Sequence, residues 1–354
     1  MAILTEKEKL KVKLKGDYET DSQFLMKSAE KFAAEGNMEA ANSASELIME
    51  IMPEKQRLEI ERLTYVEGKR LDTFYGEILQ LIKNDRKSEA LTMSKVLYDK
   101  VMDAYKETDS ARFVCLRNSF EDNICQLLHK FDKTLNRAPF DLSRYLTTYG
   151  YLLVDFNKID DAVKVLKEAE EFNPVDCGPK FELAEAYKLS KDTQALLDIT
   201  KETLKVASSP YALSRCYCNL GFYAVEVEEY DDAAVFYYTS LIFAAHPAVE
   251  GELAHLAHIS GKKLTPPDKQ TTDAVFEKYG ISYGAEEMII SVAAQLANNA
   301  LTANNIREGL IYLKILYGVT NDPEIRDVIL KYDPDAEKRI DEMVKRNFEE
   351  SQAN

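Results

Sequence analysis

Small residues recur at fixed intervals in the middle of the chain, and this spacing constrains the fold more than any other feature. Gly150 lies on the apolar face of one helical pattern, and Ala162 and Ala169 lie on the apolar face of the next. Asn157, between the two patterns, tolerates the left-handed backbone that ends a helix, and Pro174 closes the second helix. Because larger side chains would hold two helices apart, Gly150 and Ala162 predict an antiparallel helical hairpin with a close contact.

The same pattern returns further along the chain. Gly221 and Ala233 are separated by 12 residues, as are the glycine and the first alanine of the first copy. A looser copy between them contains Ala184 and Tyr187 and is closed by Pro210. The helical positions of the three copies recur at intervals of 34 and 37 residues. Regular spacing of this kind is the mark of a repeat architecture.

A helix–turn–helix period near 34 residues with these small residues is typical of the tetratricopeptide repeat. Residues 143–247 resemble three such repeats, although the chain contains no Trp and the middle copy has Lys180 at the Trp position. The resemblance implies an all-α fold, a right-handed superhelix of antiparallel helical hairpins. It also implies a concave binding surface lined by the first helix of each pair.

Fainter copies extend the pattern toward both ends, and their turn positions hold Gly36, Asp85 and Asn304, all tolerant of a helix break. We therefore expect helices throughout, including continuous helices over 54–83 and 109–131, and no sheet. The predicted segments are a basic, mobile arm over 1–20, tetratricopeptide-like hairpins over 21–137, core repeats over 138–260, and C-terminal hairpins over 268–354 with a capping helix near 335–350.

Composition limits the function. The chain has 45 Lys and Arg against 61 Asp and Glu, a formal net charge of −16, which argues against nucleic-acid or anionic membrane partners. No apolar run is long enough for a signal peptide or membrane span. The five cysteines show no disulfide or metal spacing and are interpreted as small buried hydrophobes. We expect a soluble, cytoplasmic protein without a cofactor.

The N-terminal arm carries lysines at positions 7, 9, 11, 13 and 15 with apolar residues between them. A period of two is a strand pattern, but no partner strand is evident. The simplest interpretation is a solvated arm. The alternatives are contact with an acidic partner, contact with the protein's own acidic surface, or addition as a strand to a partner's sheet.

Side chains on the first helices that stacking does not require define a candidate peptide groove. The groove residues are Arg144, Tyr151, Phe181, Lys188, Arg215 and Phe222. Aromatic anchors with basic groups suit a peptide with apolar side chains and an acidic group. The alternative is that the aromatics pack internally and the cations pair with neighbouring Glu. One subset of the family clamps a terminal carboxylate, but Thr147 and Tyr151 occupy the clamp positions, so that activity is not expected.

An enzyme is the alternative from another class. His255 and His258 are three residues apart on a predicted helix, near His246, and this spacing can hold a metal. It lacks the general base of a metalloprotease motif, and no other catalytic motif is present. We therefore predict no enzymatic activity and no metal. The expected function is a protein-interaction scaffold or adaptor that binds a protein or peptide, with self-association left open.

Overall fold

The structure, a computed structural model, describes residues 5–245 and 247–338. The chain divides into two compact units, Met1–Phe74 and Tyr75–Asn354. This division coincides with none of the segment boundaries expected from the sequence. The predicted capping helix near 335–350 lies mostly outside the described residues.

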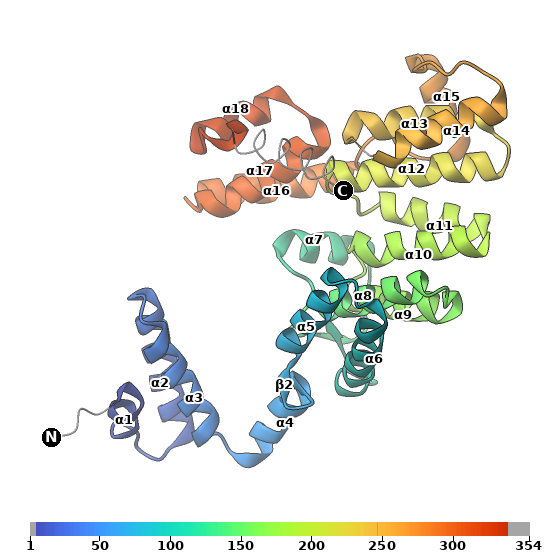
Figure 1. Cartoon of the computed structure of the whole chain (residues 1–354). Helices are drawn as coiled ribbons and strands as arrows, with labels where there is room; N and C mark the ends of the chain where they lie inside the picture. The colour runs from blue at the N-terminus through green and yellow to red at the C-terminus, as the bar shows by residue number, and fades with distance from the viewer. Residues whose placement is uncertain (1–4, 246, 339–354) are drawn as a thin grey trace. The chain divides into compact units, whose positions relative to one another are not determined.

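The expected all-α fold of paired helices is confirmed (Figure 1). The helices are α1 (Glu6–Lys11), α2 (Tyr18–Ala34), α3 (Met38–Ile51), α4 (Glu54–Thr64), α5 (Leu71–Lys83), α6 (Lys87–Ala104), α7 (Ser119–Leu128), α8 (Leu142–Asp155), α9 (Ile159–Phe172), α10 (Cys177–Ser190), α11 (Thr193–Leu204), α12 (Pro210–Glu226), α13 (Tyr230–Phe243), α14 (Pro247–Ser260), α15 (Lys269–Tyr279), α16 (Glu287–Thr302), α17 (Ile306–Thr320) and α18 (Pro323–Tyr332). The short strands are β1 (Tyr65–Val66), β2 (Lys69–Arg70), β3 (Ala111–Val114) and β4 (Thr134–Arg137).

In the first unit, α2 packs against α3, and α1 lies on α3. Residues 6–11 of the basic arm form α1. At its N-terminus, Thr5 and Glu8 form a capping box, in which each side chain binds the backbone N–H of the other. Lys7 Nζ lies 2.6 Å from Glu46 and 2.8 Å from Glu50, two carboxylates of α3. The buried Leu10 joins the small core between α2 and α3. This part of the arm therefore contacts the protein's own acidic surface.

The prediction of one helix over 54–83 is wrong. β1 and β2 form an antiparallel hairpin in which Val66 pairs with Lys69. The two turn residues, Glu67 and Gly68, have φ angles of 47° and 76°. Two consecutive positive φ values give the turn type that matches the twist of a tight hairpin, so the chain leaves the helical path here.

In the second unit, adjacent helices pack in pairs, α8 with α9, α10 with α11, α12 with α13 and α16 with α17. The first three pairs stack in succession, through α9 with α10 and α11 with α12 (Figure 1). This is a solenoid-like arrangement, in which each hairpin covers the apolar face of the next.

One turn geometry joins the helices of these pairs. Asn157 has φ 56°, and the Lys158 N–H donates to the Leu153 carbonyl at 2.8 Å. This bond, from the third residue after Asp155 back to the last turn of α8, is the Schellman motif. Lys158 is also the N-cap of α9, so one residue closes the first helix and opens the second. Equivalent positive φ angles occur at the turn residues Gly36, Asp85, Lys191, Glu228 and Asn304.

The glycines on the first helices of two pairs lie against the second helices. A Cβ added to Gly150 would lie 2.3 Å from Leu166, and one added to Gly221 would lie 2.6 Å from the Tyr237 ring. Real Cβ atoms are essentially never this close to another atom, so a larger residue would displace these neighbours. The Tyr237 ring is rigid and fully buried, so the contact at Gly221 tolerates such a change least. The sequence pattern pairs Gly150 with Ala162 and Gly221 with Ala233. Leu166 and Tyr237 each lie four residues, about one helical turn, after that alanine. The other repeat-signature residues Ala162, Ala169, Ala184 and Ala233 are buried, whereas Pro174 and Tyr187 are half-buried.

The prediction of one helix over 109–131 is also wrong. Residues 111–114 form β3, which pairs in parallel with β4, and only the later part is helical, as α7. The segment is fixed to the stack because the Cys115 N–H donates to the Phe172 carbonyl at 2.7 Å. Arg117 then binds Glu121 and the N-cap residues of α8 and α10, Asp141 and Asp176.

Lys180 shows how the weakest copy of the repeat accommodates a charge. Its side chain is 8% exposed, and its ammonium group forms an ion pair with Glu170 of α9. A buried charge is tolerated when it is paired and hydrogen-bonded. The middle copy therefore forms a regular helix pair, α10 and α11, despite a cation at the position that holds Trp in the repeat signature.

Candidate functional site

Four of the six predicted groove residues lie together on α10 and α12. The Arg215 guanidinium lies 4.5 Å from the centre of the Phe181 ring, and the Lys188 Nζ lies 5.2 Å from that of Phe222. Each cation therefore covers the aromatic ring of the facing helix. Phe181 is buried, whereas the other three side chains are half-buried.

Two glutamates of α10 complete this surface. Glu185 lies 3.0 Å from Lys188 and 3.5 Å from Arg215, and Glu182 lies 3.7 Å from Arg215. Burial raises the pKa of Glu182 above its usual value, and the nearby Arg215 acts in the opposite direction. The cations and rings of α10 and α12 are thus engaged with each other and with carboxylates. Such a surface binds a peptide only if these pairs separate.

The other two groove residues face different helices. The Arg144 guanidinium lies 6.0 Å from the Tyr75 ring centre, on α5. Lys87 of α6 lies 5.6 Å from the Tyr151 ring centre and forms an ion pair with Asp155 at 3.1 Å. Arg144 and Tyr151 therefore contribute to the packing of α8 on α5 and α6.

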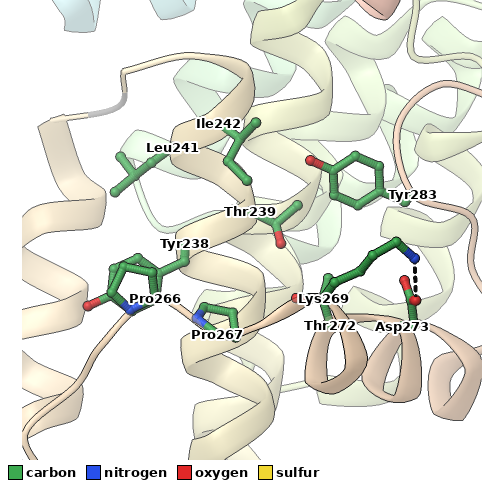
Figure 2. A pocket seen from close by; sticks show the side chains of 10 residues that line it. All are labelled: Tyr238, Thr239, Leu241, Ile242, Pro266, Pro267, Lys269, Thr272, Asp273 and Tyr283. Carbon is green, nitrogen blue, oxygen red and sulfur yellow. Dashed lines mark hydrogen bonds and ion pairs between the residues drawn. The ribbon is translucent and has the colours of Figure 1, made fainter.

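A cavity of about 580 Å³ lies between α13, α15 and the segment 261–268 that joins α14 to α15 (Figure 2). We call this segment the strap and the cavity the strap cavity. Its lining residues are Tyr238, Thr239, Leu241, Ile242, Pro266, Pro267, Lys269, Thr272, Asp273 and Tyr283. Lys269 and Asp273 pair at 2.6 Å on α15, and the Thr239 and Thr272 hydroxyls donate to backbone carbonyls. The groups left for a ligand are mainly apolar.

The wall of the strap cavity is held by specific contacts. Lys262 forms an ion pair with Asp231 at 2.6 Å, and Leu264 packs against the core, so the strap is fixed before its two prolines. Asp268 then caps α15 by accepting a hydrogen bond from the Thr271 N–H. A proline fixes its own φ angle, so Pro266 and Pro267 stiffen the wall that they form.

Tyr283 is positioned by an aromatic cluster beneath it. Tyr217 accepts a hydrogen bond from the Gly284 N–H at 2.7 Å and lies 5.5 Å from the ring centre of Phe243. Tyr283 packs against both Phe243 and Phe276, with ring centres 5.6 Å away. Gly284 has φ 84°, a conformation that glycine adopts without steric cost. These contacts place the Tyr283 ring at the cavity rim.

A second cavity of about 570 Å³ adjoins the first. We call it the α17 cavity, because the end of that helix forms one wall. Its lining residues are Pro210, Ile242, Phe243, Tyr283, Gly284, Ala285, Ile290, Tyr317, Gly318, Val319, Thr320 and Asn321. Ile242 and Tyr283 line both cavities. They are 68% and 52% exposed, so a large part of each side chain is available to a ligand at the shared rim.

Sequence reasoning missed these cavities because it treated the strap only as a domain boundary. One signal was present in α13, where the run AAVFYYTSLIF contains no charged side chain and no long stretch of polar ones. A helix that is apolar on all sides must be covered by more than one neighbour. α12, α14 and α15 cover much of α13, and Ile242 remains exposed at its end.

The histidines of the predicted alternative site do not form a metal-binding cluster in the described part of the chain. There, no group of three or more His, Cys, Asp or Glu side chains is placed to hold a metal ion. His255 and His258 are exposed on α14, and the nearby Glu252 accepts a hydrogen bond from Tyr237 at 3.1 Å. His246, the third residue of the predicted alternative site, lies outside the described residues.

The five cysteines are free, and only Cys177 is not fully buried. Burial raises the pKa of Cys115, Cys125 and Cys218 to about 11 and that of Cys177 to about 12. Burial also raises the pKa of Cys216. These thiols remain protonated at neutral pH, and the protonated form is a poor nucleophile and metal ligand.

The sequence matches no protein-family model and no curated protein. Over the residues described, helices fall short of the length and apolar character that crossing a bilayer demands.

Proposed function

We propose that the protein is a cytoplasmic interaction scaffold with tetratricopeptide-like hairpins, and that its strap cavity binds a segment of a partner protein. The observation that carries the proposal is the pair of exposed apolar side chains, Ile242 and Tyr283, at the rim of a preformed apolar cavity. Stacked helical hairpins commonly serve to present such surfaces. An apolar anchor side chain of the partner would fill the cavity and expel water from it.

The negative net charge of the protein favours a positively charged partner. The formal net charge is −16, and the ionic side chains lining the strap cavity, Lys269 and Asp273, neutralise each other. Long-range attraction therefore comes from the rest of the surface and favours a positively charged partner. The proposed ligand is a peptide segment with large apolar side chains flanked by Lys or Arg. The predicted groove of α10 and α12 remains a second surface for the same function.

The test is quantitative affinity purification of the full chain from its native cell, compared with the variant Ile242→Asp. A charge at the rim opposes burial of an apolar anchor. We therefore expect the variant to recover about tenfold less of each specific partner, which is the reduction in affinity expected when one interface hot spot is lost. Leu189→Asp is the matched control, because Leu189 is 57% exposed and lines neither cavity.

A third variant, Arg215→Ala with Phe222→Ala, separates the two surfaces. Loss of partners in this variant alone would assign binding to the α10 and α12 face. Identical partner sets in all variants, each with an unchanged circular dichroism spectrum, would reject the strap cavity as the contact surface.

A further inference from the structure

Three aromatic rings line the α17 cavity. They belong to Phe243, Tyr283 and Tyr317, and the ring centres of Phe243 and Tyr283 lie 5.6 Å apart. Tyr317 is half-buried, so part of its side chain remains accessible. The face of an aromatic ring carries negative charge density and attracts a cation that lies within about 6 Å. Three rings around one hollow therefore favour a ligand group with a positive charge.

The end of α17 adds negative potential to the same cavity. The last four carbonyl groups of a helix have no partner within it, and they form the negative end of the helix dipole. Here the Asn321 N–H donates to the Tyr317 carbonyl at 2.7 Å. The next three residues, Gly318, Val319 and Thr320, line the cavity, and the last turn of α17 holds no basic side chain. The cavity wall at the end of α17 is thus suited to a cation.

Two carboxylates flank the cavity. Glu286 directly follows the lining residue Ala285, and Asp322 directly follows the last lining residue of the α17 end. Burial raises the pKa of Tyr217, and the charge of Glu286 adds to this shift. Because the Tyr217 hydroxyl accepts a hydrogen bond from the N–H of Gly284, another lining residue, Glu286 lies beside the cavity.

One basic group of α18 lies near the cavity, and it is paired. Arg326 is close enough to Tyr317 for their charges to interact, and its guanidinium forms an ion pair with Glu337. Among the described residues, those that line the cavity include no Lys or Arg. The α17 cavity therefore combines apolar walls, three aromatic rings and a negative potential.

We propose that the α17 cavity binds a Lys or Arg side chain of the partner segment whose apolar anchor fills the strap cavity. This inference rests on the proposed function and names a second contact of the same ligand. The aliphatic part of the basic side chain packs against Ile242 and Ile290, and its charged group lies between the aromatic rings and the end of α17.

The position of the two cavities suits a single segment. Ile242 and Tyr283 line both, so an apolar anchor and a nearby basic side chain of one peptide can occupy them together. Thr320 and Asn321 are exposed at the α17 cavity, so water still reaches the charged group. A long basic side chain can therefore bury its stem and keep part of the hydration of its charge.

Titration of the full chain with Nα-acetyl-arginine methylamide tests the cation site alone, with binding followed by saturation-transfer NMR. Nα-acetyl-citrulline methylamide is the matched probe, because it has nearly the same shape and no charge. We expect citrulline to bind about fivefold more weakly, the effect of one partly exposed cation–π contact. Equal binding of the two probes would overturn the proposal.

Two variants locate the bound cation. Tyr317→Leu removes an aromatic ring but keeps an apolar side chain, and it is expected to weaken arginine binding about fivefold. Glu286→Gln removes a charge but keeps the shape, and a loss of about threefold is expected. Tyr223→Leu and Glu202→Gln are the matched controls, because neither residue lines a cavity. Equal losses in the controls, or no loss in Tyr317→Leu and Glu286→Gln, would place the cation elsewhere and refute the inference.

The affinity purification separates this inference from the proposed function. Glu286→Gln is expected to recover about threefold less of the partners that Ile242→Asp loses. If Ile242→Asp loses partners and Glu286→Gln keeps them all, the strap cavity remains the binding site and the basic contact is rejected. If arginine binds the α17 cavity but Ile242→Asp keeps every partner, the proposed function fails and the cation site stands.

Discussion

At the residue scale, each hairpin turn depends on one backbone position with positive φ. Asp85, Asn157 and Asn304 are residue types that tolerate it, but Lys191 and Glu228 occupy the same position with φ angles of 58° and 62°. The left-handed conformation costs a residue that has a Cβ atom roughly 1–2 kcal/mol, because this atom comes too close to a carbonyl oxygen. Two of the turns between paired helices therefore carry a local strain, which the contacts of the neighbouring helices offset.

Glu228→Gly is expected to stabilise the protein by about 1 kcal/mol, because glycine adopts a positive φ without a steric cost. Glu228 is exposed, so no packing is lost. For a unit of this size the gain corresponds to a rise of about 2 °C in the thermal unfolding midpoint. Differential scanning calorimetry of the full chain measures it.

The control for this prediction makes the same chemical change in a right-handed helix. Glu202 is exposed in α11, and Glu202→Gly there is expected to lower the unfolding midpoint, since glycine costs about 0.5–1 kcal/mol in a helix. If both variants unfold at a lower temperature than the unmodified chain, the positive φ at position 228 does not destabilise the protein and the prediction is wrong.

At the element scale, two of the helix pairs, α8 with α9 and α12 with α13, have a glycine on the first helix where it meets the second. In Gly221→Ala the new methyl group would lie 2.6 Å from two carbon atoms of the buried Tyr237 ring. Because the ring is enclosed, α12 and α13 must move apart, and we expect a loss of about 1–3 kcal/mol in the free energy of unfolding. Urea denaturation followed by circular dichroism checks the value.

Gly251→Ala is the matched control for this substitution. A Cβ at Gly251, in α14, meets nothing within 4 Å, so alanine should stabilise the helix by about 0.5–1 kcal/mol. Opposite signs for the two glycines are the expected result. A neutral or stabilising effect of Gly221→Ala would show that the close approach of α12 and α13 is not required.

The sequence predicts those parts of the fold that depend on local signals and misses those that depend on distant partners. The repeated small residues and turn residues gave the pairs from α8 to α13, because both signals are local. The β1–β2 hairpin and the β3–β4 pair were missed, since short strands depend on partners rather than on intrinsic preference. The tight turn at Glu67 and Gly68 was the one local signal for the first of them.

The candidate site was predictable only in its residue types. The sequence placed aromatic and basic side chains on the first helices, but it could not show that Arg215 covers Phe181 or that Lys188 covers Phe222. The strap cavity forms when segment 261–268 folds back beside α13, and no periodicity encodes that path. The exposed Ile242 could have been suspected only from the apolar composition of α13.

At the scale of the whole molecule, the two compact units differ in the size of their cores. The first unit has a small cluster of four buried residues around Leu25 and Leu47, and its α4 has no buried residue. The second has a large continuous cluster that includes Leu220. A small core offsets less conformational entropy, so the first unit should open at a lower free energy.

Two leucine substitutions test whether the units open separately. Leu47 and Leu220 are both fully buried, so Leu47→Ala and Leu220→Ala remove the same group and each should cost about 2–5 kcal/mol. We expect Leu47→Ala to speed native-state amide exchange only in the first unit and Leu220→Ala only in the second. Exchange that rises in both units with either variant would mean that the chain opens as one cooperative body. Separate responses would mean that the first unit can open and close while the stack that forms the strap cavity stays folded.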